Sequence, residues 1–290
     1  MKTKLSFLTL GMFALFATAS VMLADDSPAA MPDTRYGLLN GLDHRSSYGQ
    51  GVYPEPFLVD DSDLERREFR LDWLRTAVGD DHTDVIHPEL EWGLGNLTLE
   101  VEAPYERDVN DGSVTSGFDN VDVGARYPFY QYVSPNSVVD TTFGAAIELG
   151  IPTCSDVSRN TELVPKIFND TKLGDFTVQS IAAYSMLYGP GPDGGLGTLE
   201  YGFTFGYTIS HDVLALPGVD RLIPVFELAG ETEVNHDRQT NLTGDAGLRL
   251  NLKSIGGIQP RPGVVFVFPL NHNSREEQHW GIMTSLVFEF

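Results

Sequence analysis

Apolar and polar residues alternate one by one along much of this chain, and this alternation limits its fold more than any other feature. In residues 139–151, Val139, Phe143 and Ile147 share one parity, whereas Asp140 and Glu148 share the other. Successive side chains of a β-strand point to opposite faces, so the pattern predicts a strand with one apolar and one polar face. Equally regular runs predict strands at residues 96–106, 121–130, 199–209 and 242–253.

Weaker alternation predicts seven more strands, which bring the five above to twelve. They are expected at residues 69–78, 84–92, 161–170, 175–188, 221–232, 261–270 and 278–290. The connections alternate between short turns and longer polar loops, such as residues 108–117, a contrast typical of outer-membrane barrels. The connection at residues 211–220 does not fit, because it is long where a turn is expected.

We therefore predict an all-β fold, an antiparallel transmembrane β-barrel of about 12 strands, over residues 68–290. A soluble β-sandwich is the main alternative, since its strands alternate in the same way. The end of the chain favours the barrel, because a globular protein has no need of a terminal strand that is apolar on one face up to its last residue. The residues of this expected assembly signal, which the barrel-assembly machinery would read, are Trp280, Ile282, Leu286, Phe288 and Phe290.

The first residues have the pattern of an export signal. Lys2 and Lys4 precede an apolar stretch at residues 5–16, and Ala24 is one of two candidate cleavage sites. The apolar stretch is too short to span about 30 Å of hydrocarbon as a helix. Residues 1–24 are therefore predicted to be a cleaved signal peptide, and residues 25–67 an irregular segment that lies in the periplasm or plugs the barrel. The expected location is the bacterial outer membrane.

Charge and cysteine content exclude several classes of function. Lys and Arg total 19 against 41 Asp and Glu, a net charge of −22. Nucleic acid is not expected as a partner, because phosphate binding relies on clustered basic side chains. Cys154 is the single cysteine, so the chain has no internal disulfide framework. The expected partners are outer-membrane lipid, the barrel-assembly machinery and a small-molecule solute.

If the apolar faces meet lipid, the polar faces line a lumen rich in carboxylates. The candidate lumen-lining residues are Glu100, Glu102, Asp122, Arg126, Asp140, Glu148, Glu200, Glu227, Asp245 and Arg249. Such a lining attracts cations, because a low-dielectric wall focuses the field of its charges. Alternatively, acids and arginines pair across the lumen and close it. A barrel of twelve strands is wider than the eight-stranded kind that side chains fill, which favours an open passage.

Several short stretches resemble a known family of outer-membrane barrels. They are residues 91–94 with 97–105, residues 117–127, residues 148–153 and the terminal strand. In these stretches the chain, from about Leu90 to Phe290, resembles the phenol-degradation (MetA-pathway) family, often labelled simply transporter. The resemblance implies an outer-membrane location and the passage of small molecules, hydrophobic or aromatic ones among them. Residues 25–67 lie outside it.

Signals for catalysis and metal binding are weak. His-x-Ser occurs at His44 and at His272, but no G-x-S-x-G nucleophile motif is present. His82, Asp84 and His87 form a candidate imidazole–carboxylate cluster, although loop histidines are more often solvated. We predict a non-enzymatic channel without cofactor or metal that allows passive passage through an acidic lumen. The alternatives are a sealed barrel with a structural, adhesive or lipid-modifying role, and a soluble periplasmic ligand-binding protein.

Overall fold

The computed structural model describes residues 55–60, 67–94, 97–134, 138–191, 194–234 and 238–290. All of them belong to one compact unit, Tyr36–Phe290. The predicted signal peptide and most of the predicted segment 25–67 lie outside the described residues. Arg67, the last residue of that segment, is already the first residue of a strand.

Nearly all of the described chain is β-structure. The strands are β1 (Arg67–Val78), β2 (Asp81–Leu94), β3 (Leu97–Glu102), β4 (Tyr105–Asn110), β5 (Ser113–Phe118), β6 (Val121–Val133), β7 (Val139–Ile151), β8 (Thr161–Leu173), β9 (Phe176–Tyr188), β10 (Gly197–Tyr207), β11 (Ile209–Ser210), β12 (Val219–Glu233), β13 (Thr240–Leu252), β14 (Gln259–Pro269) and β15 (Trp280–Glu289). Two short helices are described, α2 (His211–Leu214) and α3 (His272–Glu277).

The strands form a closed antiparallel ring. Strand β1 pairs with β2 along one edge and with β15 along the other, so the first and last strands meet. Strands β3 and β4 both pair with β2, one after the other, and together form one strand of the wall. Strands β5 and β6 likewise form the next strand of the wall, since β5 pairs with β4 and β6 pairs with β3. The described part of the chain is thus a barrel of 12 strands, which confirms the predicted fold class. The alternative of a β-sandwich is wrong.

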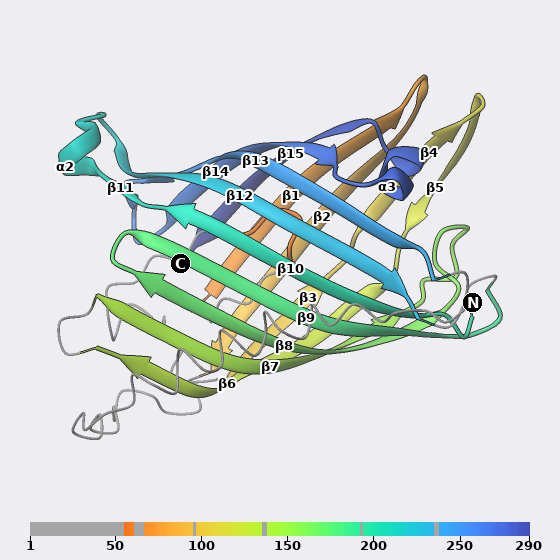
Figure 1. The fold of residues 1–290 in the computed structure, drawn as a ribbon, viewed down its shortest axis with the longest axis horizontal. Helices are drawn as coiled ribbons and strands as arrows, with labels where there is room; N and C mark the ends of the chain where they lie inside the picture. The colour runs from red at the N-terminus through yellow and green to blue at the C-terminus, as the bar shows by residue number, and fades with distance from the viewer. Residues whose placement is uncertain (1–54, 61–66, 95–96, 135–137, 192–193, 235–237) are drawn as a thin grey trace, which may run out of the picture. The chain divides into compact units, whose positions relative to one another are not determined.

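The two ends of the barrel differ in their connections. Helix α2 and the C-terminus lie at one end, and the β4–β5 hairpin and α3 lie at the opposite end (Figure 1). The turns β2–β3, β6–β7 and β8–β9 lie at the end of the C-terminus, and the longer connections β7–β8 and β9–β10 lie at the other. This arrangement matches the predicted contrast between short turns and long loops.

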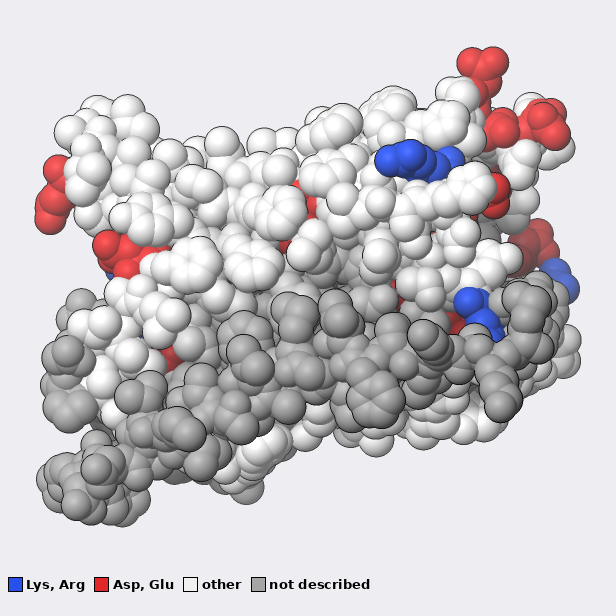
Figure 2. All heavy atoms as spheres, viewed as in Figure 1, with Lys and Arg blue, Asp and Glu red and all other residues white. Residues whose placement is uncertain are grey.

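The outer face of the ring is apolar. Large apolar side chains at alternate strand positions are exposed there, among them Leu71, Leu90, Leu99, Ile147, Ile167, Leu199, Leu248 and Phe266. Charged side chains on the face drawn in Figure 2 gather mainly toward the two ends. An apolar belt of this extent on a soluble protein would be in contact with water, at a high cost in free energy. No described helix is both long enough and apolar enough to cross a bilayer.

The terminal strand follows the same rule. Trp280 and Phe290 are exposed, and Ile282, Leu286 and Phe288 lie on the same face, because the alternate residues Gly281, Met283, Ser285 and Val287 are buried. These five side chains therefore belong to the outer belt. Their role as an assembly signal stays a prediction.

Two connections differ from expectation. Residues 108–117, predicted to be a loop, contain most of the β4–β5 hairpin. Asp111 and Gly112 both have positive φ, 48° and 77°, as a two-residue hairpin turn requires. The Asp111-Gly112 pair is a sequence signal for such a hairpin, but the polar residues on either side of it favoured the prediction of a loop. The long connection after β10 contains β11 and helix α2.

Candidate functional site

Six residues that precede the first strand lie inside the barrel. Residues 55–60, here called the inner segment, contact side chains on the inner faces of β1, β8, β12, β13 and β14. Glu55, Phe57 and Val59 are buried. Part of the predicted segment 25–67 therefore occupies the interior. Its other residues, apart from Arg67, lie outside the described part of the chain.

One carboxylate of the wall binds three successive amides of the inner segment. Glu227 accepts hydrogen bonds from the backbone N–H groups of Phe57 (2.9 Å), Leu58 (2.7 Å) and Val59 (3.0 Å). The hydroxyl of Thr204 donates a fourth hydrogen bond, of 3.3 Å, to it. Glu227 is fully buried. Hydrogen bonds to a charged acceptor contribute about 1.5–3 kcal/mol each, so this contact is strong.

Two buried arginines bind the carbonyl groups of the inner segment. Arg249 donates to the carbonyl oxygens of Glu55 (3.2 Å) and Pro56 (3.3 Å). Arg70 also donates to the Pro56 carbonyl, at 2.7 Å. The wall therefore satisfies both donors and acceptors of this backbone, which has no strand partner of its own. An unsatisfied buried backbone group would cost as much as a lost hydrogen bond.

Ion pairs anchor the two ends of the inner segment. At one end Arg261 binds the Glu55 carboxylate, with Nη1 and Oε1 2.5 Å apart. At the other end Lys166 lies 2.5 Å from an oxygen of Asp60, and it also binds Glu148. Both basic side chains are more than nine-tenths buried. The inner segment therefore has a carboxylate at each end, and each carboxylate faces a buried cation.

Phe57 is the main apolar anchor. It packs in a cluster of buried side chains that includes Val225, Val265 and Met283, and the Arg249 guanidinium lies 4.3 Å from its ring centroid. Burial of such a side chain contributes about 1.5–3 kcal/mol. The wall has no side chain at Gly263, where a Cβ would lie 2.5 Å from the Phe57 ring. This glycine makes room for the aromatic side chain.

Val59 has a second, smaller pocket. It packs against Phe168 and Ile181, and a Cβ at Gly202 would lie 2.6 Å from one of its methyl groups. Two inward-facing glycines therefore accommodate two side chains of the inner segment. The intervening Leu58 is only partly buried and packs against the cluster that holds Phe57.

Space remains around the inner segment. One cavity, of about 310 Å³, lies beside Phe57–Asp60 and is lined by charged residues of β1, β2, β3, β7, β8 and β10. Another, of about 270 Å³, is lined by Leu58, Leu74, Val267 and polar residues of β12, β13 and α3. A third, of about 90 Å³, is lined by Asp60, Glu200 and Glu231. Leu58 lines all three cavities.

All ten residues predicted to line the lumen lie on inner faces, but several of them are paired. Arg126 binds Glu100 and Glu91, and Glu102 lies 2.5 Å from Nε2 of His87. Glu148 binds Lys166, and the Gln131 amide donates to Asp140 at 3.4 Å. Glu227 and Arg249 bind the inner segment, and Asp245 lies directly opposite Glu227 in the β12–β13 ladder.

Two inner carboxylates differ from these. Glu200 lies directly opposite Glu231 in the β10–β12 ladder. Their side chains form no hydrogen bond or ion pair with another residue in the described part of the chain. Like charges at directly opposed positions repel, and neither acid forms an ion pair with a described basic side chain, so this pair adds negative potential to the interior. Asp122 is similarly without a hydrogen-bonding partner among the described side chains.

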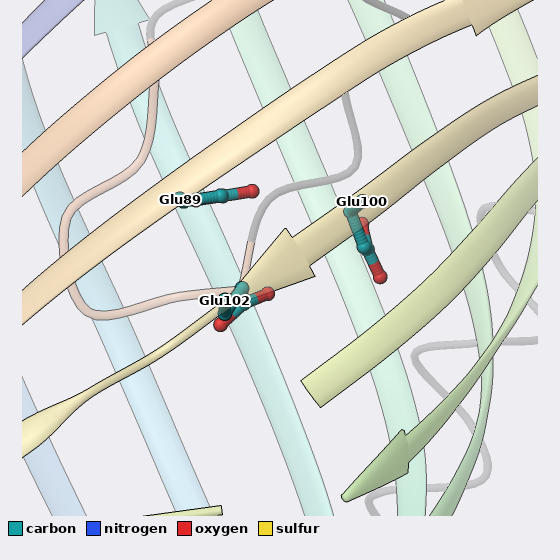
Figure 3. Close-up of side chains that lie close together, drawn as sticks. All are labelled: Glu89, Glu100 and Glu102. Atoms are coloured by element: carbon teal, nitrogen blue, oxygen red, sulfur yellow. The ribbon is translucent and has the colours of Figure 1, made fainter. Parts of the chain in front are cut away.

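A group of three carboxylates lies near Arg126. Glu89, Glu100 and Glu102 point from β2 and β3 into the same space, with oxygens within 4.8 Å of one another (Figure 3). Arg126 binds Glu100 and lies 3.8 Å from Glu89, and His87 binds Glu102. Basic side chains thus face all three acids, and the group forms an internal ion-pair network.

The candidate cluster of His82, Asp84 and His87 does not form. His82 and Asp84 lie on the outer face of β2, 3.9 Å apart, whereas His87 points inward to Glu102. Residues five apart in a strand face opposite sides, so these two imidazoles do not meet. Arg70, Lys166 and Arg261 also point inward, which was not predicted from the sequence, although their parity in the predicted strands indicates it.

The His272–Ser274 motif forms part of a helix cap. Ser274 is buried, and its hydroxyl contacts Asn271 and the Leu242 carbonyl oxygen, both within 2.6 Å. His272 is exposed and lies 3.3 Å from Glu276. The two residues have different partners, as expected of a structural cap. His44 lies outside the described residues.

Comparisons with known proteins give the fold. The chain is similar to the structure titled as a COG4313 outer membrane channel from Pseudomonas putida F1, with a TM-score of 0.54 and 15% identity over 80% of this chain and all of that one. It is also similar to the NanC porin (TM-score 0.45, 9% identity, 77% and 98% coverage) and to LpxR from Salmonella typhimurium (TM-score 0.43, 9% identity, 77% and 100% coverage). No family profile and no curated protein matches the chain.

The first of these likenesses defines the class: the chain has the fold of an outer-membrane β-barrel. At these identities the likeness concerns the fold alone. The resemblance to the phenol-degradation family therefore stays a prediction.

Proposed function

We propose that the protein is an outer-membrane channel for small solutes whose passage is closed by the inner segment. The observation that carries this proposal is a strand-free segment bound by its backbone inside a 12-stranded barrel. A barrel of this size has interior space that its own side chains do not fill. The apolar outer belt and the outward-facing terminal strand support a location in the bacterial outer membrane.

The lumen should favour cations. Glu200, Glu231 and Asp122 add negative potential, whereas Glu100, Glu102 and Glu148 have basic partners. Leu58, Leu74 and Val267 offer an apolar surface beside these charges. Small solutes that combine a positive charge with an apolar or aromatic group therefore fit this interior best, in agreement with the solutes that the family resemblance suggests.

Conductance in a planar bilayer tests the proposal. We expect small or absent currents from the wild-type chain. The full-length triple variant Glu55→Ala/Phe57→Ala/Asp60→Ala should conduct steadily, because it removes both ion pairs and the aromatic anchor without altering the wall.

Leu58→Ala is the matched control. Its side chain faces the cavities, so its loss should not release the inner segment. If the triple variant is folded but carries no current, the barrel is sealed by its wall and the proposal of a channel is wrong. Folding is monitored by the heat-dependent mobility of the barrel in gels.

A further inference from the structure

The wall of the barrel recognises the inner segment in part through groups that every peptide carries. Glu227 accepts from the amides of Phe57, Leu58 and Val59. Arg249 and Arg70 donate to carbonyl oxygens of the same stretch. In peptide-binding domains, hydrogen bonds to the main chain provide affinity and side-chain pockets provide specificity. The interior of this barrel has both.

The groups that bind the backbone and the terminal carboxylates of the inner segment are built into the fold. Glu227 and Arg249 are fully buried, and Arg70, Arg261 and Lys166 are all more than nine-tenths buried. They come from five different strands: β12, β13, β1, β14 and β8. A wall that only filled its own interior would need neither these convergent donors and acceptors nor a gap in front of Phe57 and of Val59.

The pockets define a sequence preference. The gap at Gly263 accepts an aromatic side chain at the third position of the hexapeptide, and the gap at Gly202 accepts a small apolar side chain at the fifth. Arg261 and Lys166 select carboxylates at the first and sixth positions. The fourth position, that of Leu58, faces three cavities and tolerates other side chains.

We propose that the lumen is a binding site for an extended peptide supplied from solution, and that the inner segment is its intramolecular occupant. The preferred peptide is acidic at both ends, with an aromatic third residue and a small apolar fifth residue. The proposal goes beyond passage of solutes, and it holds whether or not the barrel conducts.

Direct binding tests it without any current. The probe is a fluorescent, amidated peptide with the sequence of residues 55–60, and the readout is fluorescence anisotropy of detergent-solubilised, full-length protein. The variant Glu55→Ala/Phe57→Ala/Asp60→Ala should bind the probe saturably. The wild-type chain should bind the probe at least about tenfold more weakly, because its own inner segment competes at high effective concentration. A scrambled peptide of the same composition is the control.

A complementary pair of variants identifies the site. Gly263→Val, introduced into the triple variant, should weaken binding of the probe about tenfold or more, because the new side chain occupies the space of the phenylalanine ring. A peptide with alanine at the third position should bind the triple variant more weakly than the probe does. Its affinity should not fall further when Gly263→Val is added, because it has no ring to clash with the new side chain. A peptide with glutamine at the fourth position should bind like the probe.

Three outcomes would overturn the proposal: no saturable binding to the folded triple variant, equal binding of the scrambled peptide, or equal loss of both peptides on Gly263→Val. Heat-dependent gel mobility shows that each variant is folded. A triple variant that conducts but does not bind the probe would contradict the peptide site alone. One that binds the probe but does not conduct would contradict the channel alone.

Discussion

At the scale of single residues, the interior is organised around buried charges whose partners differ. Glu227 has three backbone donors and a hydroxyl, whereas Asp245, directly opposite, has a second buried carboxyl as its neighbour. Two buried carboxylates side by side repel unless one of them carries a proton. The two positions are therefore expected to respond in opposite ways to the same chemical change.

Glu227→Gln should lower the free energy of unfolding by about 2 kcal/mol or more, because a neutral amide cannot serve three N–H donors as a carboxylate does. Asp245→Asn should leave the stability unchanged or raise it, since the amide removes the like charge and offers a donor to Glu227. Urea midpoints in lipid bicelles measure both. A large loss on Asp245→Asn would show that this carboxylate, too, is required.

Ser274→Ala should cost about 1–2 kcal/mol and should not change lipid turnover. The hydroxyl of Ser274 accepts from the Leu242 amide and donates to the Leu242 carbonyl, so its loss loosens the attachment of α3 to β13. His272→Ala is the matched control and should do neither, because that side chain is exposed. Hydrolysis of phospholipid by refolded protein, abolished by Ser274→Ala, would instead reveal a lipid-modifying enzyme.

At the scale of elements, what the sequence predicts depends on the range of the contact. Strand β7 agrees with its prediction over residues 139–151, because a period of two needs only neighbouring residues. The inner segment could not be predicted in this way. Its amides meet a carboxylate about 170 residues away, and no local pattern encodes such a pairing. The pairing of His87 with Glu102 is of the same kind, since it depends on the register between two strands.

The terminal strand closes the barrel, and its last aromatic residues should matter for assembly. Phe288 lies opposite Phe69 of β1 on the outer face, and the Phe290 amide donates to the carbonyl of Arg67. The double variant Phe288→Ala/Phe290→Ala should reduce severalfold the fraction of heat-modifiable barrel in isolated outer membranes. Thr284→Ala, on the same face of β15, is the control. If the double variant and the Thr284→Ala control assemble equally well, Phe288 and Phe290 are not part of the assembly signal.

At the scale of the whole molecule, the fold inverts the usual distribution of polarity. Apolar side chains form the outer belt, and buried carboxylates, arginines and Lys166 form the interior. The sequence predicts this inversion through alternation alone. It does not predict which interior charges stay uncompensated, because that depends on cross-strand register. Glu100, Glu102 and Glu148 look equivalent to Glu200 in the sequence, yet each forms an ion pair with a basic side chain, and Glu200 forms none with a described residue.

Ion selectivity should therefore depend on the uncompensated acids. In the conducting variant that lacks the anchors of the inner segment, Glu200→Gln/Glu231→Gln should move the reversal potential under a salt gradient toward zero. Glu100→Gln/Glu148→Gln should shift it by a similar amount, because it removes the same number of negative charges from the inner wall. Both shifts should shrink as ionic strength rises, since screening shortens the reach of the charges.

The two pairs can be distinguished by stability. Removal of Glu200 and Glu231 relieves repulsion between opposed like charges and should not lower the urea midpoint. Removal of Glu100 and Glu148 breaks buried ion pairs and should lower the free energy of unfolding by about 3 kcal/mol or more, with a lower urea midpoint. An unchanged reversal potential in both variants would mean that ions pass along another part of the wall. A selectivity change restricted to the second pair would mean that the buried network, rather than the opposed acids, sets the field in the lumen.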